Sequence, residues 1–431
     1  MTFLFSFFLS LLLSSVSPDD PPVVHPKLGA APLHGDSITL TLVTRKQCYP
    51  TGEAATRDAD VLSPKSVNIH PDGSKYYVNS LEGMRTVVYE FETGNKLKVI
   101  HHRFNEDTKE LWAPESGYFP FSYTYAHPET FSGKPVESTF SHGGRYLWVP
   151  YYRRSYDINA QDPSAMAVID TACDSIVRVF ETGPLPKMVA TSPDGTKVAI
   201  THWGDNTVGI IDITGDDITQ WHYVGCYTVD YKLKLNYSRT VAVNRDVGSG
   251  YCLRGTLFTD DGRYLLVGCM GGSGGIAVIN LQEGTYLGRI MGAMPNLRHL
   301  IESGGYLYAS INNKGYVQRI PMEKVLETIA QLESEKQPTI QLKGWESCKV
   351  PAGARTIVAS PDGRFIFAAC NFSSKIAVVD TRTMKLVGTV DADSFPVGLD
   401  ISKDGHYLLS TSQAKPVGGG NAVDIFRIDY R

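Results

Sequence analysis

Basic residues recur at one position of an internal repeat. In four copies this position, eight residues before a turn glycine, holds a cation: Lys65, Lys187, Arg254 and Arg355. The other three copies place uncharged residues there: Val136, Asn296 and Val397. Cations that converge in a region of low dielectric attract an anion more strongly than scattered surface cations do. The position therefore indicates an anion-binding site. The alternative is that each cation points into solvent, or pairs with Glu137 or with an aspartate on a neighbouring loop.

A second set of candidates lies seven and eight residues after the turn glycine. Two copies stand out for their aromatic and polar side chains: Tyr151 and Tyr152, followed directly by Arg153, in one, and His202 and Trp203 in the other. Aromatic faces beside an arginine suit stacking on sugar rings or bases, and the guanidinium suits carboxylate or phosphate. The alternative is that these rings pack in the core. We expect them to extend the ligand site, with His202 or Tyr151 as the group that could move a proton.

The element that must position these residues is a short turn. The segment Ser192-Pro193-Asp194-Gly195 fits a type I β-turn, because proline pre-sets φ at the second position and serine can bond its own backbone. Apolar, β-branched runs flank it, which predicts a hairpin. The turn glycine recurs in seven copies: Gly73, Gly144, Gly195, Gly262, Gly304, Gly363 and Gly405. The two shortest spacings, of 42 residues, match one blade of a β-propeller.

The predicted fold class is all-β: a seven-bladed β-propeller of four-stranded antiparallel blades in a single domain over residues 36–431. Residues 36–45 alternate apolar and polar side chains, as a half-buried strand does. The last repeat has only three strands before Arg431. Because a closed ring leaves no unpaired edge, we expect the N-terminal strand to close it as the outermost strand of the last blade. Helical spacing of apolar residues predicts one helix, over 322–336, beneath blade five.

Composition places few limits on the partners. The chain has 431 residues, a net charge of −4 and 20% charged residues, so it has no global attraction for nucleic acid or membrane. The apolar run 3–16 predicts a signal peptide over 1–17 and a Pro-rich leader over 18–35. We therefore expect an exported protein, periplasmic or extracellular, with no membrane span after signal removal. A disordered or membrane-tethered N-terminus is the alternative.

Metal and cofactor motifs are missing from the sequence. His101 and His102 are adjacent on an expected strand, so their side chains point to opposite faces. No His-Glu-x-x-His, Gly-x-Ser-x-Gly or Cys-x-x-Cys pattern occurs. We expect no metal and no cofactor. Cys252 and Cys269 lie symmetrically about one turn, so a disulfide across that hairpin is open, although buried thiols are the alternative.

The repeat resembles the YVTN repeat of YncE-like bacterial seven-bladed propellers, in the quinoprotein amine dehydrogenase β-chain-like superfamily. The resemblance covers nearly the whole mature chain and is carried most clearly by residues 201–208, Thr-His-Trp-Gly-Asp-Asn-Thr-Val, and by Cys370-Asn371-Phe372 with 376–380. It implies the fold. It says little of function, because such propellers include binding modules, lactonase-like sugar enzymes, polysaccharide lyases, nucleic-acid binders and redox subunits. No catalytic motif of the family matches here.

The function that these patterns favour is binding of an anionic ligand, with an acidic carbohydrate first, in the upper central funnel of the propeller. An enzyme on such a sugar, a uronate lyase or a lactonase-like protein, is the alternative. In a lyase Arg254 or Arg355 would neutralise the carboxylate, and His202 or Tyr151 would abstract the α-proton. Single-stranded nucleic-acid binding uses the same cations and rings. A protein-interaction scaffold is a further alternative.

Overall fold

The turns join strands as the repeat predicts. In the computed structural model, Ser192 Oγ donates to Asp194 Oδ1 at 2.5 Å, and Gly195 N donates to Ser192 O at 2.9 Å. Gly195 has φ +71°, a left-handed conformation that glycine adopts without strain. The turn links β14 (Pro186–Thr191) to β15 (Lys197–His202) as an antiparallel pair.

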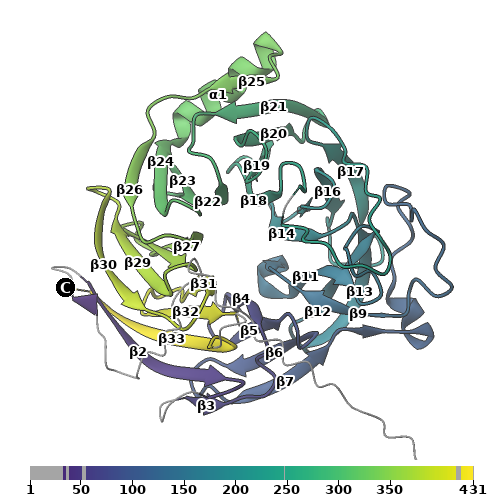
Figure 1. Ribbon diagram of the computed structural model, residues 1–431, viewed down its shortest axis with the longest axis horizontal. Coiled ribbons are helices and arrows are strands. Elements are labelled where there is room, and N and C mark those ends of the chain that lie inside the picture. Colours follow the sequence, from purple (N-terminus) through teal and green to yellow (C-terminus); the bar gives the residue numbers. More distant parts are fainter. Residues whose placement is uncertain (1–32, 35–37, 51–54, 247, 414–418, 431) are drawn as a thin grey trace, which may run out of the picture.

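The structure describes residues 33–34, 38–50, 55–246, 248–413 and 419–430. The predicted signal peptide and all of the predicted leader except Leu33–His34 lie outside these ranges. Figure 1 shows seven blades around a common axis. In the first three blades the strands are β4 (Pro64–Ile69), β5 (Lys75–Ser80), β6 (Arg85–Glu90) and β7 (Lys96–His101); β8 (Arg103–Phe104), β9 (Phe131–Pro135), β10 (Thr139–Ser141), β11 (Tyr146–Arg154), β12 (Ser164–Asp170) and β13 (Ser175–Thr182); and β14, β15, β16 (Thr207–Asp212) and β17 (His222–Thr228).

The remaining blades follow the same order from the axis outward. Blades four to six contain β18 (Leu253–Phe258), β19 (Tyr264–Cys269), β20 (Ile276–Asn280), β21 (Thr285–Met291) and β25 (Thr339–Gln341); β22 (Leu297–Ser303), β23 (Tyr306–Ile311), β24 (Tyr316–Pro321) and β26 (Glu346–Lys349); and β27 (Ala354–Ala359), β28 (Phe365–Cys370), β29 (Lys375–Asp380) and β30 (Lys385–Asp391). Blade seven contains β31 (Pro396–Ile401), β32 (Tyr407–Ser412), β33 (Ala422–Tyr430), β2 (Ile38–Gln47) and β1 (Leu33–His34), and β3 (Thr56–Arg57) pairs with β2. Two short 3-10 turns, η1 (Glu106–Leu111) and η2 (His142–Gly144), lie in the connections.

The N-terminal strand closes the ring, as the sequence predicts. Strand β2 runs antiparallel to β33 over its whole length, and Ile38, Leu40 and Leu42 are buried there. Arg45 donates two hydrogen bonds to Asp424, at 2.6 and 2.8 Å, and both side chains are buried. The first and last described strands are therefore joined by backbone bonds, apolar packing and a buried ion pair.

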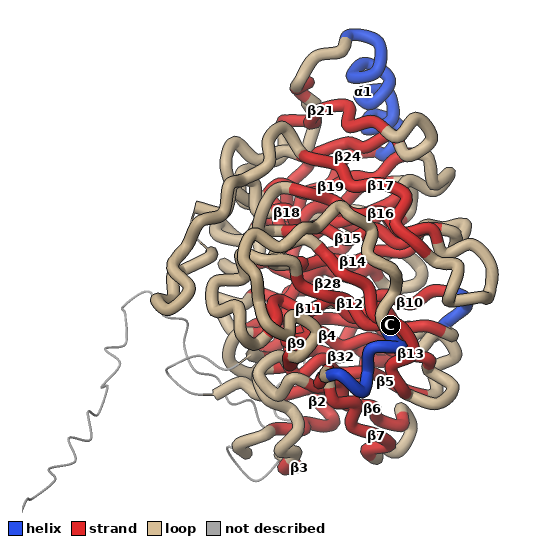
Figure 2. Tube along the Cα trace, turned by 90° about the vertical axis from the view of Figure 1, so that its right-hand side faces the viewer, coloured by secondary structure: helices blue, strands red, loops and turns tan. Residues whose placement is uncertain are grey.

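The predicted helix is present as α1 (Met322–Glu335). Figure 2 shows it at one rim of the ring, outside β21 and β24. Its apolar face packs in a core cluster shared by blades four and five, with Val325, Ile329 and Leu332 buried. Glu333 accepts hydrogen bonds from Tyr264 and Asn280 of blade four. The helix thus joins two blades, rather than covering blade five alone as the sequence suggested.

The cysteine pair does not form a disulfide. Cys252 and Cys269 are both free and buried, and Cys269 lies opposite Leu253 in the β18–β19 ladder. Cys252 packs instead in a small cluster that includes Leu185 and Trp203. The expectation that the two cysteines face each other is wrong. It assumed that the strands pair symmetrically about the Thr259–Gly262 turn, whereas the observed pairing is displaced by one residue, so that Cys269 faces Leu253. Among the described residues, no helix is long and apolar enough to cross a membrane.

Candidate functional site

The repeated cations lie at one structural position, a β-bulge near the start of each innermost strand. The ladder between the first two strands shifts register there in blades one, three, four and six. The residues at or directly beside the shift are Lys65, Lys187, Arg254 and Arg355. A bulge interrupts the alternation of side chains and re-aims the residue it contains. The inner strands β4, β14, β18 and β27 lie around the common axis (Figure 1), so the shared bulge gives the four cations equivalent places near it. Lys65 and Arg355 are close enough to other cations of this set for their pKa values to be lowered by them.

A fifth cation, Arg298, occupies the same position and was missed by the sequence analysis. In blade five the register shift falls between Leu297 and His299, so Arg298 matches Lys65, and Asn296 does not. A residue with positive φ precedes the cation by two positions in both blades, Asn296 here and Ser63 in blade one. The error has a simple cause. The hairpin connection is two residues shorter in blade five, so Arg298 lies six residues before Gly304, and the position eight residues before it is Asn296.

The cations are buried and incompletely paired. Lys65, Lys187, Arg254 and Arg355 are each 2–6% exposed. Three of the five carry a buried guanidinium nitrogen without a hydrogen-bond partner in the described part of the chain: Arg254 Nη1, Arg298 Nε and Arg355 Nε. A buried donor left without an acceptor costs about 1–3 kcal/mol. A bound anion that reached these nitrogens would recover that cost.

The lowered pKa values of these cations show that they repel one another. The pKa of Arg355 is lowered to about 9, first by burial and next by Arg254. Burial also lowers the pKa of Arg298 well below its ordinary value, and Arg355 adds to that decrease. The pKa of Lys65 falls in the same way. Neighbouring cations thus destabilise the charged forms of Arg355, Arg298 and Lys65, and a bound anion would relieve this repulsion.

Two carboxylates face the cations in the described residues. Arg254 Nη2 donates to Glu137 Oε1 at 2.7 Å, so the pairing with Glu137 that the sequence left open is present for this one arginine. Asp246 lies exposed on the connection between blades three and four, and the cations, Lys187 first, lower its pKa. Five cations against two carboxylates leave the group, which we call the cation ring, with an excess of positive charge.

Lys187 is held by aromatic faces. Its Nζ lies 4.3 Å from the ring centroid of Tyr152 and 5.1 Å from that of Trp203. The pKa of Lys187 is lowered to about 7, chiefly by burial, and Asp246 opposes the decrease. Trp203 itself is buried and donates from Nε1 to Arg245 O at 3.2 Å. Tyr152 and Trp203 therefore lie beside the cation ring, whereas Arg153 bonds its own loop, donating to Asp157 O at 2.8 Å.

The two groups considered for proton transfer are enclosed away from solvent. Tyr151 is fully buried, and its hydroxyl lies 2.9 Å from His102 Nδ1. His202 is also fully buried; its Nε2 accepts from Gly183 N at 3.1 Å, and its Nδ1 lies 2.8 Å from Thr207 Oγ1. Burial lowers the pKa of His202 to about 3. Both side chains are packed within the blades, in agreement with the alternative that these rings belong to the core.

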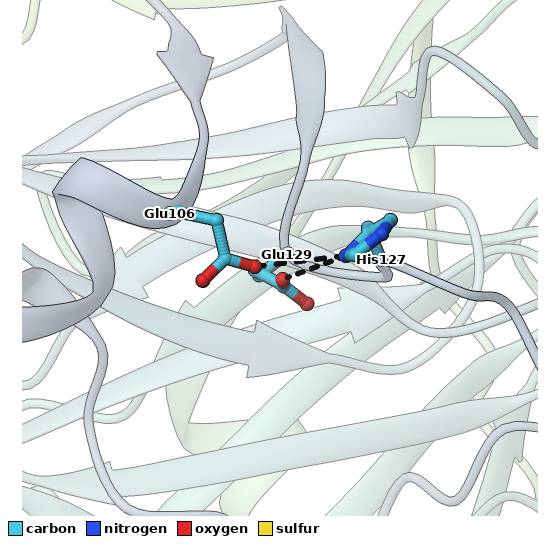
Figure 3. Close-up of side chains that lie close together, drawn as sticks. All are labelled: Glu106, His127 and Glu129. Carbon is cyan, nitrogen blue, oxygen red and sulfur yellow. Dashed lines mark ion pairs between the residues drawn. The ribbon is translucent and has the colours of Figure 1, made fainter.

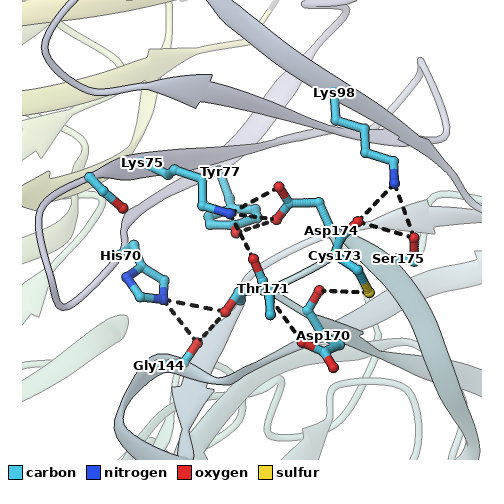
Figure 4. Close-up of polar contacts among 12 residues, drawn as sticks. His70, Lys75, Tyr77, Lys98, Gly144, Asp170, Thr171, Cys173, Asp174 and Ser175 are labelled. Carbon is cyan, nitrogen blue, oxygen red and sulfur yellow. Dashed lines mark hydrogen bonds and ion pairs between the residues drawn. The ribbon is translucent and has the colours of Figure 1, made fainter.

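The hairpin turns lie at the other end of the inner strands and carry a separate polar network (Figure 4). Lys75 Nζ donates to Thr171 O at 2.7 Å and to Asp174 Oδ2 at 3.0 Å, and Tyr77 donates to Asp174 Oδ1 at 2.5 Å. His70 Nε2 lies 3.1 Å from Gly144 O. This network joins blades one and two, so residues of this face have structural partners.

One cluster of side chains of the types that ligate metals was not predicted from the sequence. Figure 3 shows Glu106, His127 and Glu129 close together, with a ligand atom of each within 4.8 Å of the others. Two of the three are largely exposed, and Glu106 already forms an ion pair with Lys109. We assign the cluster to a surface ion-pair network. His101 and His102, beside one another in the chain, are exposed and fully buried respectively, so they do not form a site together.

Comparisons with known proteins support the fold. No family model matches the chain. The hydrazine synthase β subunit of Kuenenia stuttgartiensis is 27% identical over 251 residues, which cover 51% of this chain and 59% of that protein. Antigen Lp49 of Leptospira interrogans is 23% identical over 211 residues, covering 44% of this chain and 41% of that protein. The chain thus spans about half the length of these relatives.

Solved structures give the same result. A chain of Kuenenia stuttgartiensis hydrazine synthase matches with a TM-score of 0.58 and 14% identity, covering 88% of this chain and 99% of that one. The β-propeller domain of Cps50 (Swd1) from Myceliophteria thermophila matches with a TM-score of 0.56 and 13% identity, covering 85% and 96%. These likenesses establish a seven-bladed β-propeller and extend no further than the fold.

Proposed function

We propose that this propeller binds an anionic ligand at the cation ring, with an acidic carbohydrate as the leading ligand class. The observation that carries the proposal is the convergence of five cations, four of them buried and Arg298 half-buried, one from each of five blades, on one bulge position. Charge-assisted hydrogen bonds to a carboxylate or phosphate are about twice as strong as neutral ones. The flanking rings of Tyr152 and Trp203 provide apolar surface beside the charges.

Binding is favoured over catalysis by the placement of the candidate bases. A uronate lyase needs a base within reach of the α-proton. Tyr151 and His202 are enclosed and hydrogen-bonded within the blades, so neither supports a lyase or lactonase at the cation ring. Membership of the YVTN-repeat family and export from the cytoplasm stay predictions from the sequence; both agree with a ligand-binding role.

The proposal is tested by calorimetric titration with defined probes. We expect digalacturonate, citrate or inorganic phosphate to bind, whereas a neutral galactose disaccharide does not. Affinity for these probes should fall only modestly as salt rises, because buried charges are screened much less than exposed ones. Oligothymidylate, titrated in parallel, distinguishes the nucleic-acid alternative: a steep salt dependence with indifference to uronates would favour it. Absence of binding by every anionic probe would contradict the proposal.

The protonation of Lys187 predicts how affinity depends on pH. The amine has a pKa of about 7 in the free protein, so its charge is lost as the pH rises through that value. An anion stabilises the ammonium form, and binding should therefore take up protons near neutral pH. We expect weaker binding at about pH 8.5 than at about pH 6. Titrations in buffers of different ionisation enthalpy measure the uptake directly. The variant Lys187→Met should bind more weakly at the lower pH and should lose part of the pH dependence.

A further inference from the structure

A cavity that shares no lining residue with the cation ring lies at the insertion between blades one and two. It has a volume of about 270 Å³ and is bounded on one side by Trp112, Phe121 and Pro128. Most of the lining residues follow β8, within η1 and after it, and Arg154 at the end of β11 also lines the cavity. Nothing in the proposed anion site uses these residues.

Arg154 is a buried cation without an acidic partner. It is 4% exposed, and no carboxylate of the described residues lies within ion-pairing distance. Its Nη1 donates to Pro128 O at 2.6 Å and its Nη2 to Ser164 O at 3.1 Å, which fixes the guanidinium in place. The Nε has no acceptor. Burial lowers the pKa of Arg154, and Tyr156, Glu181 and Asp162 offset this only in part, so a carboxylate brought to the guanidinium would stabilise its charge.

Trp112 offers a second donor to the same cavity. Its indole Nε1 is buried and has no hydrogen-bond partner in the described part of the chain. The Arg154 guanidinium lies 5.1 Å from the centroid of this indole and 4.9 Å from that of Phe121. Two residues with unsatisfied donors, one of them charged, therefore line one small cavity with aromatic walls. Such convergent polar groups in an apolar pocket are typical of ligand sites.

Most of the other charged residues that line the cavity are acidic. The cavity is also lined by three carboxylates, Glu115, Glu129 and Glu181, against one lysine, Lys109. Lys109 is already paired with Glu106. Glu181 Oε1 accepts from Ser116 N at 2.7 Å, which holds that carboxylate in place. A ligand with only a negative charge would be repelled by these acids, whereas one with an added ammonium group would be attracted.

We propose that this cavity binds a free amino acid with an apolar side chain, its carboxylate received by Arg154 and the Trp112 indole and its ammonium by the surrounding glutamates. The volume suits such a molecule, because a cavity of about 150 Å³ holds benzene. The class is distinct from the multiply charged anion proposed for the cation ring.

The test is calorimetric titration with three related probes on the full chain. L-Phenylalanine should bind, whereas 3-phenylpropionate, which lacks the ammonium, and phenethylamine, which lacks the carboxylate, should bind at least about tenfold more weakly. The variant Trp112→Phe keeps the ring but removes the donor, and it should weaken phenylalanine binding about tenfold. Glu129→Gln should weaken it in the same direction.

The matched control is Trp345→Phe. Trp345 also carries a buried Nε1 without a partner, but it packs in the cluster of blades four and five and does not line the cavity. Its loss should leave phenylalanine binding unchanged. Melting temperatures of all variants show that each is folded. No binding of phenylalanine, equal effects of the two tryptophan variants, or equal affinity for phenylpropionate would each overturn the proposal.

Discussion

The double variant Arg298→Met and Arg355→Met should lose affinity for an anionic probe by about a hundredfold or more. Each guanidinium presents a buried donor that has no protein acceptor, and each hydrogen bond to a charged group is worth about 1.5–3 kcal/mol. Since about 1.4 kcal/mol is tenfold in affinity, two such contacts account for the expected loss. Methionine keeps most of the aliphatic length, so the surrounding packing is retained.

Stability should stay the same or rise in this variant. Arg355 lowers the pKa of Arg298, which means that the two charges repel each other in the folded state. Arg254 is left unchanged on purpose, because its loss would leave the buried Glu137 carboxylate without its partner. Calorimetry gives the affinity and a thermal melt gives the stability.

The control is Lys197→Met on the opposite face. The Lys197 ammonium makes one described hydrogen bond, of 3.2 Å to Thr196 Oγ1, whereas Lys75 forms an ion pair with Asp174 and its loss would disturb contacts between blades. Affinity that survives the arginine pair yet falls with Lys197→Met would place the site at the turns and refute the cation ring.

A chain that begins at Lys46 should fail to unfold cooperatively, or should aggregate. It would lose the buried side chains of Ile38, Leu40 and Leu42, each worth about 1.5–3 kcal/mol. It would also leave Asp424 buried without Arg45, at a cost of about 3–5 kcal/mol. Together these approach the whole stability of a typical protein, about 5–15 kcal/mol. The exposed edge of β33 would then be free to pair with another chain.

Size-exclusion chromatography and thermal melts measure this effect. Removing residues 1–30 alone should leave both the monomer and the melting curve unchanged, since β2 is retained. A monomer beginning at Lys46 with an unaltered melt would show that β2 is dispensable for closure.

Local sequence patterns predicted the blades because the contacts that form each hairpin turn join residues only a few positions apart in the sequence. The Ser-Pro-Asp-Gly signal set the hairpins, the unpaired last repeat pointed to Ile38–Gln47, and apolar spacing gave α1. Four of the five ring cations followed from the same count. The fifth, Arg298, required the strand register, because a shorter turn displaces the count by two residues.

Contacts between distant segments could not be predicted in this way. Phe119 of the first insertion packs against His202 with ring centroids 5.1 Å apart. His202, which the sequence placed in the ligand site, is therefore covered by a loop more than eighty residues earlier in the chain. Tyr151 is likewise covered by Phe104 and Phe131. The repeat specifies where a residue falls in its blade, and the insertions determine which of these positions solvent can reach.

The bulge at the start of each inner strand has a consequence for how ligand preference can change. Its residue is excluded from the regular ladder, so a substitution there alters the charge around the axis without altering the strand pairing. Blades two and seven hold Val136 and Val397 at this position, both fully buried. Replacing one residue per blade would thus vary the charge at the axis in unit steps, and propellers with the same scaffold could diverge toward ligands of different charge through single substitutions.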